Sequence, residues 1–94
     1  MATTGMSNTE SLASQIRTVL RDHGRLSRPI ENVVDDADLY QAGMTSHASV
    51  NVMLALEGVF DIEFPDHMLK RSVFTSIASI RDALVELEQA RSMQ

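Results

Sequence analysis

The sequence predicts a small all-α protein: a four-helix bundle of three main helices and one short helix, with a long loop between the first two. Apolar residues recur every three or four positions in three segments, and capping residues precede each of them. The one stretch that alternates like a strand has no partner in the chain. With 94 residues, 44% of them hydrophobic, the chain should form one domain. We place this domain at residues 7–90, between a disordered start at 1–6 and a C-terminal tail at 91–94.

The first helix is expected to begin in a capping box and to end at a glycine. Ser7 occupies the N-cap position, and Glu10 follows three residues later, so that each side chain can accept a backbone N–H at the helix start. Gly24 should stop the helix after about Asp22, because glycine favours the left-handed conformation found past helix ends. The apolar stripe of this amphipathic segment consists of Leu12, Ala13, Ile16, Val19 and Leu20.

Residues 25–45 form the longest irregular stretch. No hydrophobic period survives in it, and Pro29, Asn32 and Gly43 interrupt it. A loop of roughly twenty residues is unusual in so small a domain, and it is expected to be functional or to be held by its own apolar side chains. The candidates for that role are Ile30, Val33, Val34, Leu39 and Tyr40, and the last two should form a short helical turn before Gly43.

The second helix is predicted over residues 46–59. Apolar side chains surround much of it, and Glu57 is its only charged residue. A helix of this kind is expected at the centre of the bundle, in contact with both flanking helices. Gly58 lies near its end and should cost about 1 kcal/mol relative to alanine.

The segment after this helix alternates apolar and acidic residues. Phe60, Ile62 and Phe64 are separated by Asp61 and Glu63, a period of two that by itself indicates a strand. Because no other segment could pair with it, we interpret these residues as an extended connector with three buried apolar side chains.

Two further helices complete the predicted bundle. Pro65 suits the first position of a short helix over residues 65–70. Thr75 or Ser76 should cap a longer helix that runs to about Ala90. The expected core contacts of the short helix and the link after it are Met68, Leu69, Val73 and Phe74, and those of the last helix are Ile77, Ile80, Leu84 and Leu87.

Charge is unevenly distributed along the chain. The net charge of −5 disfavours binding to nucleic acid or to an anionic membrane surface. All eight Lys and Arg lie outside Pro29–Leu69. That acidic block contains Glu31, Asp35, Asp36, Asp38, Glu57, Asp61, Glu63 and Asp66. Such a block either maintains solubility as a solvated face or steers basic partners toward Ser46 at its centre.

The composition also bounds the setting in which the protein works. Cysteine is absent, so no disulfide framework and no thiolate metal site is possible. No apolar run approaches the roughly 20 residues that a transmembrane helix needs. The N-terminus lacks the basic and apolar regions of a secretory signal. We expect a cytoplasmic monomer that binds neither nucleic acid nor membranes.

The turn before the second helix is the strongest candidate site. It runs Gly43-Met44-Thr45-Ser46 and opens directly into the apolar helix. A serine hydroxyl there could hold a phosphate, because the first N–H groups of a helix are unpaired and the helix dipole favours negative charge. Local chemistry alone favours a plain helix cap, a role that Thr45 and Ser46 suit equally well.

No catalytic set is visible in the sequence. Adjacent residues at a helix start project about 100° apart, so His47 is poorly placed to act as a base for Ser46. The three histidines lack helical metal-ligand spacing, and the four glycines form no phosphate-binding loop. We therefore expect no enzymatic activity and no metal.

Taken together, the serine turn and the segment after the second helix resemble the acyl carrier protein family. The likeness covers roughly residues 9–88. The matching positions are Gly43, Met44, Ser46, Val50, Leu54, Glu57, Phe60, Ile62, Glu63 and Pro65, with Asp38-Leu39 upstream. The resemblance implies that Ser46 carries 4′-phosphopantetheine, donated from coenzyme A by a phosphopantetheinyl transferase. The thiol of this arm would hold the cargo as a thioester.

Two residues depart from the usual family pattern. Thr45 stands where an aspartate is common, and His47 stands where a leucine is common. With these two residues, the sequence resembles a subgroup of the family: aminoacyl carrier proteins that are loaded by ligases related to class II aminoacyl-tRNA synthetases. The resemblance implies an amino acid as cargo and an amino acid:carrier-protein ligase as partner. Partner contacts are expected at Met44, on an exposed turn, and at Thr45, His47, Glu57 and Asp61.

Two alternatives stay open at this point. The first is a fatty-acid or polyketide carrier that a different acyl-loading enzyme serves. The second is an unmodified helical adaptor that binds its partners through the acidic face.

Overall fold

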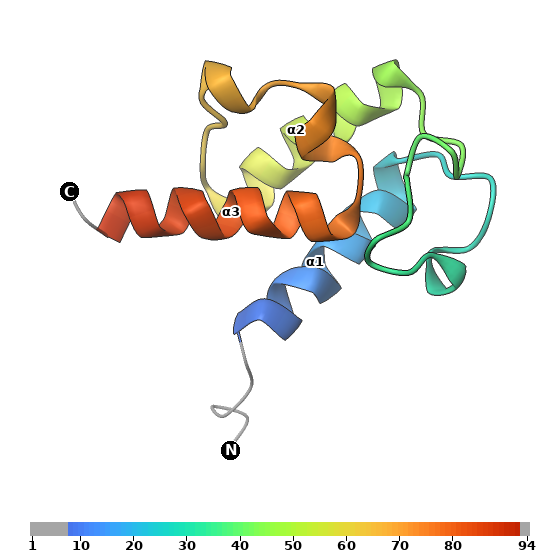
Figure 1. The fold of residues 1–94 in the computed structure, drawn as a ribbon, viewed down its shortest axis with the longest axis horizontal. Helices are drawn as coiled ribbons and strands as arrows, with labels where there is room; N and C mark the ends of the chain where they lie inside the picture. The colour runs from blue at the N-terminus through green and yellow to red at the C-terminus, as the bar shows by residue number, and fades with distance from the viewer. Residues whose placement is uncertain (1–7, 93–94) are drawn as a thin grey trace.

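The computed structural model describes residues 8–92, which form three α-helices joined by irregular segments (Figure 1). α1 spans Asn8–His23, α2 spans Ser46–Phe60 and α3 spans Ile77–Ser92. No strand occurs among these residues, so the predicted all-α class and the irregular connector after α2 are confirmed. The disordered start expected at 1–6 and the Ser7 cap lie outside the described residues. None of the helices described is both long and apolar enough to cross a bilayer.

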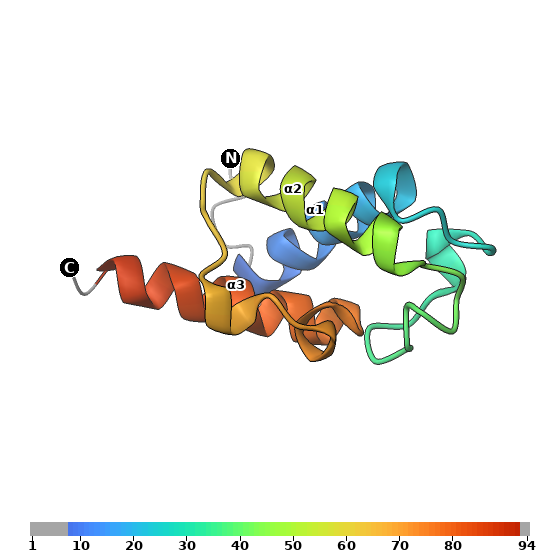
Figure 2. The same cartoon turned by 90° about the horizontal axis from the view of Figure 1, so that it is seen from above.

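α1 is the central helix of the fold. It packs against both α2 and α3, and Figure 2 shows it between the layers that these two helices form. The expectation that α2 would be central is wrong, because Val50, Leu54 and Val59 are each about half exposed. A chain this short has too few elements to cover every side of an apolar helix.

The core draws side chains from every helix and from the loop. The largest fully buried residues include Ile16, Leu20, Leu39, Leu56, Ile77 and Ile80, which confirms the predicted stripes of the first and last helices. The rings of Phe64 and Phe74 meet edge to face, with centroids 5.4 Å apart and planes at 73°. The connector after α2 is thereby packed against the segment before α3.

The long loop is packed largely as predicted. Ile30, Val33 and Leu39 are buried, whereas Val34 is 67% exposed, contrary to expectation. Val33 has extended backbone angles, and successive side chains of an extended chain point in opposite directions, so only one of the two valines can face the core. Residues 38–43 form hydrogen-bonded turns, as expected before Gly43.

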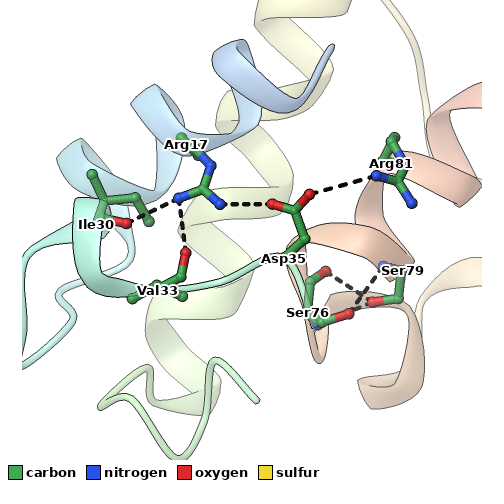
Figure 3. A network of polar contacts seen from close by, with 7 residues as sticks. All are labelled: Arg17, Ile30, Val33, Asp35, Ser76, Ser79 and Arg81. Carbon is green, nitrogen blue, oxygen red and sulfur yellow. Dashed lines mark hydrogen bonds and ion pairs between the residues drawn. The ribbon is translucent and has the colours of Figure 1, made fainter. Parts of the chain in front are cut away.

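One arginine fastens the loop to the helices (Figure 3). Arg17 Nη1 donates hydrogen bonds to Ile30 O at 3.0 Å and to Val33 O at 2.8 Å, and Nη2 donates to Asp35 Oδ1 at 2.6 Å. The other oxygen of Asp35 lies 3.8 Å from Arg81 Nη1 on α3. Because these contacts join α1, the loop and α3, the loop has a fixed position relative to the helices.

The segment between α2 and α3 differs in detail from the prediction. Two 3₁₀ turns, Asp66–Met68 and Arg71–Phe74, replace the single short helix expected at 65–70. Met68 is buried as predicted, but Leu69 is 46% exposed. Leu69 leaves helical geometry at φ −87° and ψ 68°, which turns its side chain away from the inward face.

α3 begins at a reciprocal serine cap. Ser79 N–H donates to Ser76 Oγ, and Ser76 N–H donates to Ser79 Oγ, each at 3.0 Å (Figure 3). Ser76 is therefore the cap among the two candidates that the sequence offered. The helix continues two residues beyond the predicted end at Ala90.

Candidate functional site

Gly43 shapes the turn that leads into α2. Its φ is +116°, and an added Cβ would lie 2.7 Å from Ser27 N, closer than real Cβ contacts come. Ser27 is held there because both its N–H and its hydroxyl donate to Ala42 O, each at 2.8 Å. A side chain at position 43 would therefore collide with fixed backbone and adopt an unfavourable conformation.

Met44 lies inside the protein and not on its surface. The side chain is 2% exposed, and its N–H donates to Leu39 O at 3.0 Å. The expectation that Met44 is exposed is wrong, because the turn folds back onto the loop and places this residue in the core. Met44 thus helps to fix the start of α2. Its contact with a partner stays a prediction.

Thr45 caps α2 and leaves Ser46 available. Thr45 Oγ1 accepts a hydrogen bond from Ala48 N–H at 3.0 Å. The neighbouring hydroxyl of Ser49 donates to Ser46 O at 2.7 Å. Ser46 is exposed as the first residue of the helix, and its hydroxyl has no hydrogen-bond partner in the described part of the chain. Among these adjacent hydroxyls, that of Ser46 is the one without a structural task.

The electrostatics at Ser46 suit an anion. Thr45 is neutral, and the first turn of α2 contains no acidic residue. The unpaired N–H groups and the positive end of the helix dipole are therefore not compensated by a side chain. A phosphate on Ser46 Oγ would lie where that field is most favourable to it, so this position fits a phosphate-linked group.

Ser46 also lies on a surface groove of about 260 Å³. Val50, Met53 and Phe74 contribute apolar surface to the groove, and Lys70 and Arg71 contribute positive charge. No carboxylate belongs to its lining. The sequence does not predict this groove, because its residues come from the loop, from α2 and from the segment before α3, and no local motif relates them.

The remaining predicted site residues divide between the two ends of α2. His47 is exposed beside Ser46. Glu57 lies eleven residues further along, which is about 16 Å of helix, and its Oε2 accepts a hydrogen bond from Phe64 N–H at 2.9 Å. Asp61 is exposed at the C-cap in the left-handed conformation. The structure therefore keeps Glu57 and Asp61 apart from the serine turn.

The acidic block is smaller at the surface than its sequence suggests. Asp35 pairs with two arginines, Asp38 accepts the N–H of Tyr40 at 2.9 Å, and Glu57 fastens the connector. The exposed carboxylates of this block that form no ion pair or hydrogen bond with the described residues are Glu31, Asp36, Asp61, Glu63 and Asp66.

An exposed serine at a helix start, on a small helical fold, is the arrangement of a carrier protein. The family model described as the phosphopantetheine attachment site matches residues 12–84. The chain is also 49% identical over 69 residues to an aminoacyl carrier protein of Agrobacterium fabrum, covering 73% of this chain and 83% of that protein. The chain belongs to the phosphopantetheine-binding carrier protein family. Its cofactor is 4′-phosphopantetheine, and its class is a carrier, not an enzyme, as the resemblance implied.

Two of the solved structures with the same fold are ligase complexes. One matched chain is 45% identical with a TM-score of 0.78, covering 80% of this chain and 97% of its own. It belongs to a crystal structure of an engineered Bradyrhizobium japonicum glycine:[carrier protein] ligase with a carrier protein from Agrobacterium tumefaciens and ATP. A second, 25% identical with a TM-score of 0.68 over 78% of this chain and 97% of its own, belongs to the Bradyrhizobium japonicum ligase complexed with glycylated carrier protein.

Proposed function

We propose that the protein carries a small amino acid as a thioester on a 4′-phosphopantetheine arm attached to Ser46, and delivers it between enzymes. The observation that carries the choice of residue is the exposed Ser46 hydroxyl, which is free of hydrogen bonds within the described residues at the capped start of α2. The choice of cargo is supported by the aminoacyl carrier relative and by the neighbours bound to glycine:[carrier protein] ligases.

The chemistry at Ser46 is a phosphoryl transfer from coenzyme A, catalysed by a phosphopantetheinyl transferase. The Oγ–P bond forms as the P–O bond to the nucleotide half of coenzyme A breaks, and the hydroxyl proton leaves. Thr45 fixes the start of α2. The unpaired backbone N–H groups in the first turn of this helix favour the phosphate. The attached group supplies a terminal thiol that holds the cargo.

The second partner in this proposal is an amino acid:carrier-protein ligase. Thr45, His47 and Asp61 are exposed and can contact it directly. Met44 and Glu57 would act through the positions that they give to the serine turn and the connector. A monomeric state and a cytoplasmic location stay predictions.

The cargo is expected to be short and polar for a physical reason. Each exposed CH₂ of a long acyl chain forgoes about 0.8 kcal/mol of burial. The buried face of α2 is filled by Ala48, Val52 and Leu56, each 0% exposed, so a chain too long for the surface groove beside Ser46 would have to displace core contacts to be covered. An aminoacyl group needs no such shelter and can stay in water at the end of the arm.

A loading competition tests the proposal. Holo protein would be offered ATP and glycine with a glycine:[carrier protein] ligase, and separately long fatty acids with an acyl-carrier synthetase. Intact mass should show a glycyl adduct on the arm and little long-chain adduct. Efficient long-chain loading without aminoacylation would restore the fatty-acid alternative. If the holo protein cannot be prepared, because a phosphopantetheinyl transferase adds no arm from coenzyme A, the unmodified adaptor is restored.

A further inference from the structure

We propose that Arg71, assisted by Lys70, binds the phosphodiester of the arm, so that the root of the arm lies along the groove beside Ser46 and does not project freely into water. This inference rests on the proposed attachment at Ser46. It adds a role for residues outside the serine turn, on a segment that the chain reaches only after α2 has ended.

The first observation is that two cations lie by this groove without a carboxylate partner. Arg17, Arg21 and Arg81 all form ion pairs with aspartates. Lys70 and Arg71 form none within the described residues, although the chain contains thirteen acidic residues. Among the residues that the structure describes, Arg25 and Arg28 also form no ion pair, but neither lines the groove.

The second observation is that Arg71 is held in place by an aromatic ring. Its Cζ lies 3.9 Å from the centroid of the Tyr40 ring. Tyr40 is itself fixed, because it packs against the core and its N–H donates to Asp38 Oδ1. Contact through the face of the guanidinium leaves the N–H donors at its edge free, and these are the donors that bind phosphate oxygens. Arg71 can therefore keep the ring contact and still donate to an anion.

The third observation is that one groove contains both the attachment residue and the cations. Ser46, Lys70 and Arg71 line it together with the apolar side chains of Val50 and Met53. A phosphodiester on Ser46 is covalently attached to a residue that lines this groove. Its contact with the two cations is therefore intramolecular, and the effective concentration of the anion beside them is high. Opposite charge and the absence of any lining carboxylate favour the phosphate, and the apolar surface suits the carbon chain that follows it.

The experiment compares holo proteins that differ in one arginine. The wild type, Arg71→Gln and Arg28→Gln would each be loaded with one arm, as verified by intact mass. Arg28→Gln is the matched control because it removes the same charge from an exposed arginine that forms no ion pair with the described residues and lies outside the groove. The measurements are the phosphorus-31 chemical shift of the phosphodiester and nuclear Overhauser contacts from the arm to the methyl groups of Val50 and Met53.

The expected result is a distinct phosphorus shift and arm-to-methyl contacts in the wild type and in Arg28→Gln. In Arg71→Gln the shift should move toward that of a phosphodiester free in solution, and the contacts should be lost. Arg71→Lys should give an intermediate shift, since lysine keeps the charge without the planar donors. Amide spectra of the apo variants would establish that each is folded.

Other outcomes separate this inference from the proposed function. If no arm appears on Ser46, the proposed function fails and this inference fails with it. If the arm is attached but the phosphorus shift is the same in wild type and Arg71→Gln, with no methyl contacts, only this inference is overturned. If the phosphorus shift and the methyl signals of Val50 and Met53 change only when a ligase is added, the groove is a contact surface for the ligase and does not bind the arm. That result would also overturn this inference.

Discussion

Thr45 Oγ1 accepts the N–H of Ala48 at 3.0 Å, so the residue before Ser46 caps α2. Where the family commonly has an aspartate, this chain caps the helix with a neutral hydroxyl. The field at the helix start is therefore not compensated by a side chain and is available to the arm that we propose for Ser46. Under the proposed function, capping and attachment are separate tasks of two adjacent residues.

Removing the two hydroxyls should have different effects on stability. Thr45→Ala should lower the free energy of unfolding by about 1 kcal/mol, because an N–H at the helix start loses its partner. Ser46→Ala should change it by less than about 0.5 kcal/mol, as is usual for an exposed side chain without contacts. Urea denaturation of the apo proteins measures both, and Thr45→Ser is the control that keeps the cap. A larger loss for Ser46→Ala would mean that Ser46 has a structural role.

Alanine substitutions at Gly43, before α2, and at Gly58, inside α2, should have opposite effects on stability. An added Cβ at Gly58 meets nothing within 4 Å, so Gly58→Ala should raise the free energy of unfolding by about 0.5–1 kcal/mol through helix propensity. Gly43→Ala should lower it by more than about 1 kcal/mol, because φ is positive and Ser27 N is in the way. Thermal and chemical unfolding measure the pair. Equal effects at both positions would contradict this explanation of the turn.

Arg17 should contribute more to stability than Arg81. Arg17→Met leaves two backbone carbonyls of the loop and Asp35 without their donor, and should cost about 1–3 kcal/mol. Arg81→Met removes only partly exposed ion pairs, including that to Asp35 at 3.8 Å, and should cost less than about 1 kcal/mol. Amide hydrogen exchange in residues 30–37 should accelerate in the first variant only. Similar behaviour of both variants would show that the loop is held in another way.

Exposed carboxylates near the end of α2 should speed encounter with a basic ligase surface. Asp61→Lys and Glu63→Lys should together slow association several-fold, and added salt should slow the wild type, since exposed charges are screened beyond about 8–10 Å. Glu57 is unsuitable for this test because its carboxylate accepts Phe64 N–H. Glu86→Lys, a single change on the exposed part of α3, is the control. The association rate constant is measured by stopped flow. A rate constant that changes neither with added salt nor with these substitutions would favour the solubility interpretation of the acidic block.

Sequence periodicity predicted the helices because each one repeats a local pattern over three or more turns. Ile16 and Leu20 of α1, and Ile77 and Ile80 of α3, are fully buried where their spacing placed them. The sequence could not show which helix is central, because that depends on which faces the other elements cover. Nor could it show that Met44 points inward, since the direction of a side chain in a turn follows from the long-range packing of the loop.

The serine turn was visible in the sequence, and its surroundings were not. The family resemblance predicted Ser46 as the attachment residue, but Tyr40, Val50 and Arg71 meet in one groove only after the chain has folded. The roles of Asp35 and Glu57 were hidden for the same reason. A carboxylate that accepts a distant N–H or guanidinium looks identical in sequence to one that is exposed to solvent.

Peptide mapping by mass spectrometry, after incubation with coenzyme A and a phosphopantetheinyl transferase and then with ligase, ATP and glycine, tests attachment and cargo most directly. We predict one arm on the peptide that contains Ser46 and one glycyl group on that arm. Ser49→Ala and Thr45→Ser should load as the wild type does, and Ser46→Ala should acquire neither group. An arm on Ser46→Ala in the same yield as on the wild type would contradict the assignment of Ser46.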